Sequence, residues 1–258
     1  MIDDNRQKYL FDDFTLENYR KIIQVAKNNH FQFSFFHDRY NDSAKSVLWR
    51  HDVEFSPFAA LEMATIETEE GAKSTYFFQL HSECYNVIEK AVADIVFKIK
   101  LLGHDIGLHF DTHFFNVDNV IDLERYLALD VHYFNAIFNT EIKSFSFHNT
   151  NAFILNCEKT HYAGLINVYS KYFKRRFKYC ADSTGYWRYE RLIDVLNNPD
   201  IKKLHVLTHD AMWNAEVLPP RQRVFLSIDE NSRRIKQWYD NTLKKFGAKN
   251  VDWNEVYE

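Results

Sequence analysis

Short segments rich in β-branched and aromatic residues alternate with longer segments of helical periodicity along most of the chain. The expected strands cover residues 46–50, 74–80, 105–108, 144–147, 178–181 and 204–207. The expected helices cover residues 17–29, with Thr15 placed as N-cap, and 57–70, 87–102, 117–138, 189–196 and 228–246. Alternation of this kind indicates a parallel sheet covered by helices.

Ionisable residues follow directly after five of these expected strands. They are Asp52, His109, His148, Asp182 and His209. In a parallel barrel the carboxyl ends of all strands open on one face, so these five side chains can converge. In an open doubly wound sheet the crevice lies at a switch point, where residues from five strands would not meet as naturally. The pattern therefore favours an α/β fold with a closed or nearly closed barrel.

Composition supports one folded domain. The chain has 258 residues, of which 46% are hydrophobic and 17% aromatic, and its six glycines and four prolines form no linker-like stretch. We expect a single domain over residues 1–258, with an N-terminal helical and aromatic extension (1–45), a motif-bearing barrel (46–215) and a C-terminal helix (216–258).

Charge and hydropathy limit the classes of partner. A formal net charge of −4 argues against a generic nucleic-acid surface, which needs a concentrated basic field. No stretch reaches the ~18 consecutive apolar residues of a membrane span, and the N-terminus has no signal-like apolar region. The three cysteines, Cys84, Cys157 and Cys180, are widely spaced, which is typical of a reducing compartment. We expect a cytoplasmic protein without a membrane span.

The segment 104–113 carries metal-ligand spacing. His109 and His113 stand four residues apart after an apolar run, and they would share a face if the chain became helical there. Asp52 and Glu54 stand two apart at another strand end, and both reach one site only if the chain turns there. One of these carboxylates would bind the metal and the other would act as a base. Alternatively, both merely cap the helix that begins near Pro57.

Other residues are candidates for acid catalysis and substrate contact. His209 would need an orienting carboxylate to work as an acid, and Asp210 is adjacent to it in the sequence. Trp187, Arg188 and Trp213 would supply flat apolar walls and a cationic hydrogen-bond donor for a sugar ring or acyl group, although aromatic residues are usually core.

These motifs resemble the polysaccharide deacetylase superfamily, with its NodB-homology or carbohydrate esterase family 4 fold. The first motif of one branch, Arg-His-Asp-Val-Asp, is similar to residues 50–54, which include Arg50 and His51, and that branch is associated with surface-polysaccharide biosynthesis. The second motif, G-H-E-I-G-x-H-x-x-x-H, is similar to residues 103–113, and the last is similar to residues 207–209. The resemblance covers roughly residues 46–215 and implies a distorted (β/α) barrel of about seven strands.

The resemblance also implies roles for individual residues. Asp52 would be the general base, His209 the general acid, and Glu54, His109 and His113 the ligands of one divalent metal ion, with zinc expected among several suitable ions. Glu54 replaces the family's aspartate ligand. Residues 146–149 replace its R-x-P-[FY]-G motif, so Arg50 and Arg188 are both candidates for the arginine that supports the base. The expected residues around the metal or substrate are Arg50, His51, His148, Asp182, Trp187, Arg188, Asp210 and Trp213.

The implied activity is metal-dependent hydrolysis of an N-acetyl or similar acyl group on a saccharide, with an N-acylated sugar or glycan as the substrate. Two alternatives stay open. One is a glycan-binding or biosynthesis module that keeps the barrel without turnover, and the other is a metal-dependent hydrolase of another C–N amide. The sequence does not indicate the sugar, the acyl group or the oligomeric state.

Overall fold

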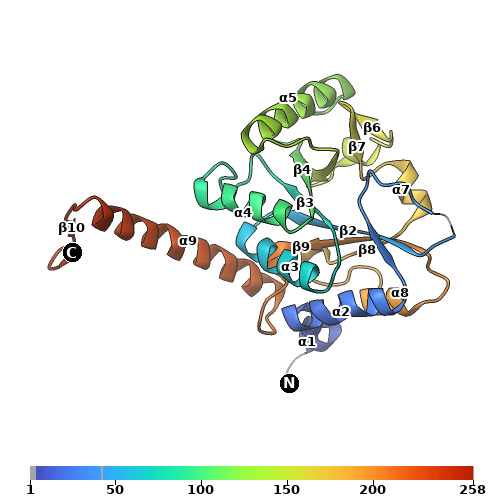
Figure 1. The fold of residues 1–258 in the computed structure, drawn as a ribbon, viewed down its shortest axis with the longest axis horizontal. Coiled ribbons are helices and arrows are strands. Elements are labelled where there is room, and N and C mark those ends of the chain that lie inside the picture. The colour runs from blue at the N-terminus through green and yellow to red at the C-terminus, as the bar shows by residue number, and fades with distance from the viewer. Residues whose placement is uncertain (1–3, 42, 258) are drawn as a thin grey trace.

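The computed structural model describes residues 4–41 and 43–257 and shows an α/β fold built on a strongly curled, mostly parallel sheet (Figure 1). Eight strands form a half-barrel. Their order is β6 (His161–Tyr162), β7 (Leu165–Asn167), β5 (Ser144–His148), β4 (Asp105–Asp111), β3 (Thr75–Phe78), β2 (Ser46–Val53), β9 (Lys203–His209) and β8 (Lys178–Ala181). A further short strand, β1 (Gln32–Ser34), pairs in parallel with the first residues of β2.

The sheet is not the closed or nearly closed barrel that the strand ends favoured. Within residues 4–41 and 43–257, the strand path ends at β6 and β8, which do not pair with each other. The β6–β7 pair is antiparallel and comes from the segment 161–167, where we expected no strand. This hairpin extends one side of the sheet without reaching β8.

Most of the longer helices pack against the convex side of the sheet, whereas the short helix at residues 171–176 places Phe173 on the concave side. The helices are α1 (Asp4–Lys8), α2 (Leu16–Asn28), α3 (Pro57–Glu69), α4 (Lys90–Leu101), α5 (Val120–Phe138), α6 (Ala152–Leu155), α7 (Lys171–Arg176), α8 (Leu192–Asn197) and α9 (Pro220–Lys245). The expected cap of α2 is confirmed, because the Thr15 hydroxyl accepts the backbone N–H of Asn18. Three single turns, η1 (Phe11–Phe14), η2 (Ser183–Gly185) and η3 (Asp210–Met212), and a terminal hairpin, β10 (Asn250–Val251) with β11 (Val256–Tyr257), complete the described chain.

Several strands are longer than the sequence predicted. β2, β4 and β9 continue to Val53, Asp111 and His209, so Asp52, His109 and His209 belong to strands. Asp52 pairs in register with His209, and Asp111 pairs with His148. Because side chains alternate along a strand, this register decides which residues face the concave side.

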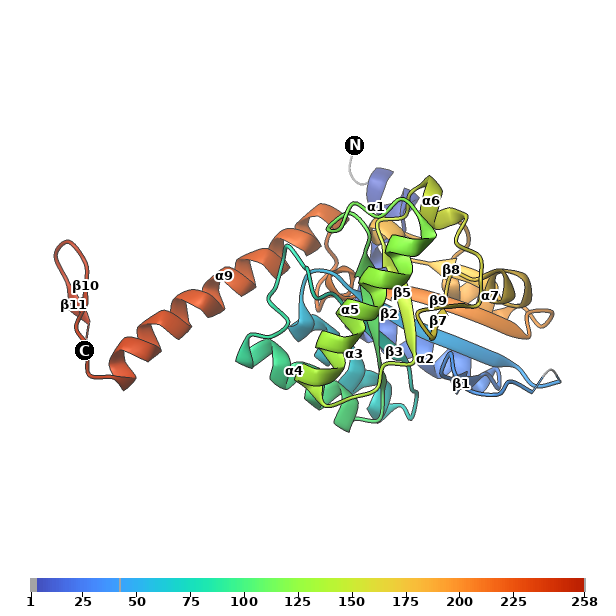
Figure 2. The same ribbon diagram turned by 90° about the horizontal axis from the view of Figure 1, so that it is seen from above.

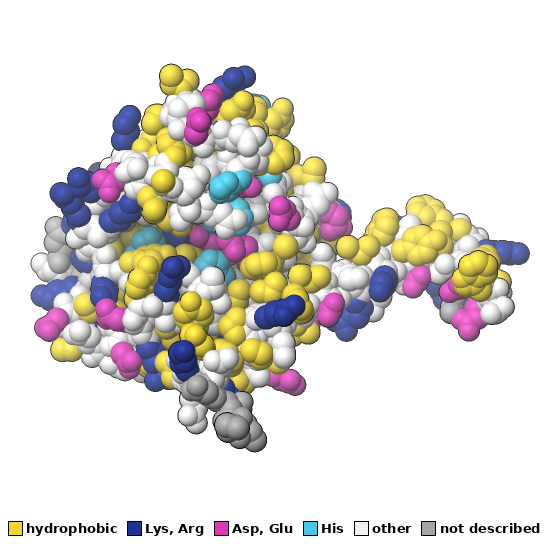
Figure 3. Space-filling model, turned by 180° about the vertical axis from the view of Figure 1, so that it is seen from behind, with side chains coloured by type: hydrophobic (Ala, Val, Ile, Leu, Met, Phe, Trp, Pro, Cys, Tyr) yellow, Lys and Arg dark blue, Asp and Glu magenta, His cyan; other side chains and the backbone are white. Residues whose placement is uncertain are grey.

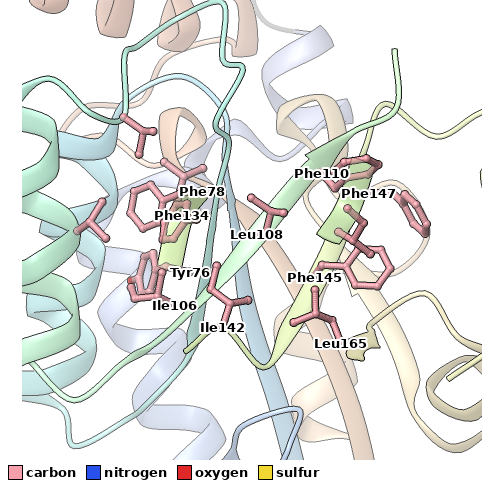
Figure 4. Close-up of a cluster of buried hydrophobic side chains, with 14 of the residues drawn as sticks. Tyr76, Phe78, Ile106, Leu108, Phe110, Phe134, Ile142, Phe145, Phe147 and Leu165 are labelled. Atoms are coloured by element: carbon pink, nitrogen blue, oxygen red, sulfur yellow. The ribbon is translucent and has the colours of Figure 1, made fainter. Parts of the chain in front are cut away.

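Apolar side chains fill both faces of the curled sheet. A large buried cluster lies between β3, β4, β5 and the helices α4 and α5; it includes Phe78, Leu108, Phe134 and Phe145 (Figure 4). A smaller cluster closes the concave side away from the strand ends, and its buried members are Phe36, Leu48, Phe77, Val168, Phe173 and Phe177. We call this smaller cluster the plug.

Gly107 shows how tightly the plug fits. A Cβ at this position would lie 2.3 Å from the Phe77 ring, so β4 needs glycine where it passes over that ring. The plug leaves only the carboxyl ends of the strands open, and a site at that end has a closed floor.

None of the helices within residues 4–41 and 43–257 combines the length and the apolarity that a bilayer crossing needs.

Candidate metal centre

Side chains alternate between the two faces of β2, and this alternation places candidate side chains on the concave side of the sheet. In β2, Leu48, Arg50 and Asp52 face the concave side, while Trp49 packs into the apolar cluster beneath α2. His51 therefore points the other way.

Glu54, His109 and His148 form the one group among the described residues whose ligand atoms could hold a metal ion. Glu54 Oε1 lies 3.3 Å from His109 Nε2 and 3.2 Å from His148 Nδ1, and the two ring nitrogens are 3.2 Å apart. A tetrahedral zinc ion with ligands at about 2.0–2.1 Å has ligand atoms about 3.3–3.4 Å apart. One carboxylate oxygen and two imidazole nitrogens at these separations therefore fit such an ion. We call these three residues the metal triad.

Hydrogen bonds fix the tautomer of His109. The Ser146 hydroxyl donates to Asp52 Oδ1 (3.1 Å) and lies 2.7 Å from His109 Nδ1. A hydroxyl that donates to the carboxylate accepts from the ring, so Nδ1 carries the proton. The lone pair of Nε2 is then directed at the triad, as a metal ligand requires.

Glu54 is positioned by Asp210 through the backbone. The buried Asp210 carboxylate accepts the backbone N–H groups of Glu54 (2.8 Å), Phe55 and Ser56. These bonds turn the chain after β2, which is the turn that lets Asp52 and Glu54 reach one site. The N-cap of α3 is Ser56, so neither Asp52 nor Glu54 caps that helix.

Electrostatics in the triad favour an ionised carboxylate. Burial alone would raise the pKa of Glu54, but its contacts with His109 and His148 hold that pKa well below the usual range. Burial alone would lower the pKa of His148, but the Glu54 carboxylate raises that pKa above its usual value.

His113 does not join the triad. After β4 ends at Asp111 the chain forms a turn rather than a helix, and the next helix, α5, begins only at Val120. The backbone N–H of His113 donates to Asp111, and its exposed ring contacts the carbonyl oxygen of Asn149. The i, i+4 spacing therefore does not bring His109 and His113 onto one face, and His148 from β5 occupies the third position.

Asp52 lies beside the triad in a buried polar cluster. Its Oδ2 accepts from Arg50 Nη2 (3.2 Å), and that nitrogen also donates to the Tyr169 hydroxyl. Burial would lower the pKa of Arg50, but Asp52 raises it, so the guanidinium is charged and faces the carboxylate. Of the two candidate arginines, Arg50 contacts Asp52. Arg188 lies exposed at the rim of the pocket.

His209 is held by Asp182 rather than by Asp210. Asp182 Oδ1 lies 2.6 Å from His209 Nδ1, and Oδ2 accepts from the backbone N–H of His209 and from the Trp213 indole. Burial would lower the pKa of His209, but Asp182 raises it to about 10. The ring is therefore protonated at neutral pH, and its Nε2 side lines the pocket.

Asp52, His209 and two members of the metal triad, Glu54 and His109, line one pocket of about 480 Å³, and His148 lines a neighbouring pocket that shares Glu54. Its floor lies on the plug residues Val168, Phe173 and Phe177, and its rim carries Lys174 and Arg188. Histidine and acidic side chains gather around the middle of one face of the molecule, where the surface is hollowed (Figure 3).

Three other sequence candidates, His51, Trp187 and Trp213, lie away from this pocket. His51 contacts Glu67 (2.8 Å) and Thr208 on the convex side of the sheet. Trp187 donates to Asp13 and packs against Phe14. Trp213 is buried, and its indole N–H donates to Asp182.

Three residues that the sequence analysis did not single out support the site. They are Ser146, Tyr169 and Gln79, whose side-chain amide contacts His148 Nδ1 at 2.9 Å. Ser146 and His148 alternate along β5, which pairs with β4, and this alternation is the signal that could have identified Ser146 and assigned His148 as a ligand.

No protein-family model matches the chain, and a search of curated proteins also found no match.

Proposed function

We propose that this protein is a metal-dependent hydrolase that removes an N-acetyl or similar acyl group from a saccharide, with a NodB-like deacetylase site. The observation that carries the proposal is that Asp52 and His209 line the same pocket as Glu54 and His109 of the metal triad. A base, an acid and a cation site around one pocket are the parts that amide hydrolysis needs. We further propose that it acts in the cytoplasm, in bacterial surface-polysaccharide biosynthesis.

Glu54, His109 and His148 would hold the divalent ion, for which we propose zinc. Such an ion supplies Lewis acidity toward the acyl carbonyl and toward a water molecule. Asp52 takes the proton of the attacking water, and Arg50 and Ser146 hold its two oxygens in place. His209 gives its proton to the leaving amine nitrogen, so the C–N bond breaks to a free amine and a carboxylic acid.

The charge states of the two proton-transfer groups fit these roles. A general acid must begin protonated, and the pKa of about 10 keeps His209 in that state at neutral pH. Asp182 keeps the Nδ1 side of the ring occupied, which leaves the Nε2 proton for transfer.

The test is acetate release from N-acetylated monosaccharides, sugar nucleotides and glycan fragments by zinc-loaded protein. We expect turnover by the wild type, and for Asp52→Asn a loss of about 100-fold or more with zinc content unchanged, as for removal of a general base. Asp94→Asn, on the exposed face of α4, is the matched control and should keep full activity.

Three outcomes would count against the proposal. Zinc binding without any acyl release would favour a glycan-binding module. Release of formate or ammonia from other amides would assign a different C–N substrate. An Asp52→Asn variant with wild-type turnover would remove the proposed base.

A further inference from the structure

Helix α9 leaves the body of the protein and carries the terminal hairpin at its far end (Figures 1 and 2). Its 26 residues give a length of about 39 Å. All of them are described, and the side chains buried within α9 are Arg223 and Ser227, both near its beginning. Helices in proteins depend mainly on the packing of an apolar face, and most of α9 has no such packing against the described residues of this chain.

Large apolar side chains are exposed along α9 and just beyond it. Ile235 is 57% exposed, Trp238 63% and Phe246 76%. Contiguous apolar surface of this kind marks an interaction site.

One face of α9 has a regular pattern. Its members, spaced four and three residues apart in turn, are Ile228, Ser232, Ile235, Tyr239, Thr242 and Phe246. This 3.5-residue repeat forms a seam like that of a coiled coil. We call it the α9 seam. The seam is symmetric about residue 237, because Ile228 and Phe246, Ser232 and Thr242, and Ile235 and Tyr239 are each equally far from that position.

We propose that α9 is a dimerisation arm and that its partner is α9 of a second copy of this chain, running antiparallel with the twofold axis at residue 237. This arrangement sets apolar residues opposite apolar residues and hydroxyls opposite hydroxyls. An isologous contact of this type needs a self-complementary surface, which the symmetric seam provides.

The body of the protein adds a preformed groove to this surface. Phe55, Glu83 and Cys84 line a groove of about 470 Å³ together with Ile228, Ser232 and Ile235. Asn231 donates to the carbonyl oxygen of Cys84, and the Arg234 guanidinium lies 3.5 Å above the Phe58 ring. These contacts fix the angle of α9, so the groove is ready to receive the far end of a second α9.

The first test is the solution mass of the full chain at tens of micromolar, by light scattering coupled to gel filtration. We expect about twice the 30.9 kDa chain mass for the wild type. Ile235→Asp should halve that mass. Gln237→Asp introduces the same carboxylate on the exposed face opposite the seam and should remain dimeric. A monomeric wild type, or a dimeric Ile235→Asp variant that is folded by circular dichroism, would overturn the proposal.

The second test fixes the direction by disulfide trapping in a Cys84→Ser background. A mixture of Ile228→Cys and Phe246→Cys chains should form a covalent heterodimer under mild oxidation. Each variant alone should not, because like positions are about 27 Å apart along an antiparallel pair. Efficient cross-linking of either variant with itself, without cross-linking in the mixture, would contradict the antiparallel arrangement.

Discussion

At the scale of single residues, His148 and His113 differ in a way that metal binding can measure. His148 lies in the triad, while His113 lies in the turn after β4. We expect His148→Ala to reduce zinc affinity by more than the ~10–100-fold that loss of an outer hydrogen-bond partner costs. His113→Ala should leave the affinity within a few fold of wild type. Competition with a chromophoric zinc chelator measures both variants.

The opposite result for these two variants would show that residues 109–113 rearrange around the ion and that the H-x-x-x-H pair is the ligand pair. Ser144→Ala is a suitable background control. Ser144 lies on the same face of β5 as Ser146 and His148. Its hydroxyl has no hydrogen-bond partner among the described residues.

Asp182 controls the proton on His209, which gives a second prediction at this scale. In Asp182→Asn the largest raising influence is lost, while burial and the raising influence of Glu54 and Asp52 remain, so the pKa of His209 should fall from about 10. Because the general acid must be protonated, activity should then be lost at lower pH than in the wild type. NMR titration of the ring and the pH profile of kcat measure the two effects separately.

Trp213→Phe is the matched control for Asp182→Asn, because it removes one hydrogen bond to the same carboxylate but keeps its charge. The pKa of His209 should stay high in this variant. If the pKa in Asp182→Asn also stayed near 10, another group would have to hold the proton.

The site shows where prediction from sequence stops. Sequence identified the strand ends that supply Asp52, Glu54, His109 and His209, because ionisable residues after β-rich segments are visible in a single chain. It did not identify the partner of His209. Asp210 is adjacent but faces the backbone of residues 54–56, whereas Asp182 comes from the neighbouring strand end. The register of β8 against β9 decides whether Asp182 or Asp210 contacts His209, and this register cannot be predicted from the residues that neighbour His209 in the sequence.

At the scale of secondary-structure elements, Glu67 ties α3 to the sheet. This carboxylate is 1% exposed and accepts from the hydroxyls of Tyr19 and Tyr76, and it contacts His51. Burial would raise the pKa of Glu67, but His51 and the other hydrogen-bond partners lower it to about 2.

A lowered pKa in the folded state makes the protein less stable in acid. The contribution is fully present above the unfolded value of about 4.5 and is lost as the pH falls toward 2. It is on the order of 3 kcal/mol. We therefore expect the urea midpoint of the wild type to fall steeply between pH 4.5 and 2, and that of Glu67→Gln to be lower at neutral pH and flatter in acid. Glu69→Gln, exposed on the same helix, should follow the wild-type curve.

Element lengths were the weaker part of the sequence prediction. The six predicted helices are present, but α1, α6 and α7 were not predicted, and α9 begins at Pro220 rather than at residue 228. The strands β2, β4 and β9 continue past their predicted ends, because polar residues such as His109 and Asp111 do not look like strand residues locally. Parallel pairing with buried neighbours keeps them in the sheet. The two- and three-residue strands β6 and β7 are too short to show any periodicity.

At the scale of the whole molecule, the sheet is open because its two end strands, β6 and β8, do not pair with each other. The β6–β7 hairpin forms one end, β8 forms the other, and the aromatic residues of the plug fill the concave side between them. The alternation of strands and helices indicated a parallel sheet, and the ionisable residues after the strands favoured a closed or nearly closed barrel, which the structure does not form. Closure depends on how long-range aromatic packing, such as Phe36 against Phe173, fills the interior.

The metal triad joins the loop after β2 to β4 and β5, so an ion there would link separate strands of the half-barrel. A ligand that binds only the folded state, at 100 times its Kd, stabilises that state by about 2.7 kcal/mol. For a chain of this size, this corresponds to a rise in Tm of about 5–10 °C. We therefore expect zinc to raise the Tm of the wild type by that amount in differential scanning calorimetry, and chelation to reverse the rise.

Glu54→Ala should abolish this shift, because two ring nitrogens alone no longer provide three ligands. Ile235→Asp, which changes only the α9 seam, should retain it whether or not the protein is dimeric. An undiminished shift in Glu54→Ala would place the stabilising ion at other residues, since a folded-state ligand raises Tm wherever it binds. Comparing the two variants therefore separates the metal site at the strand ends from the proposed interface on α9, because each variant changes one surface and leaves the other intact.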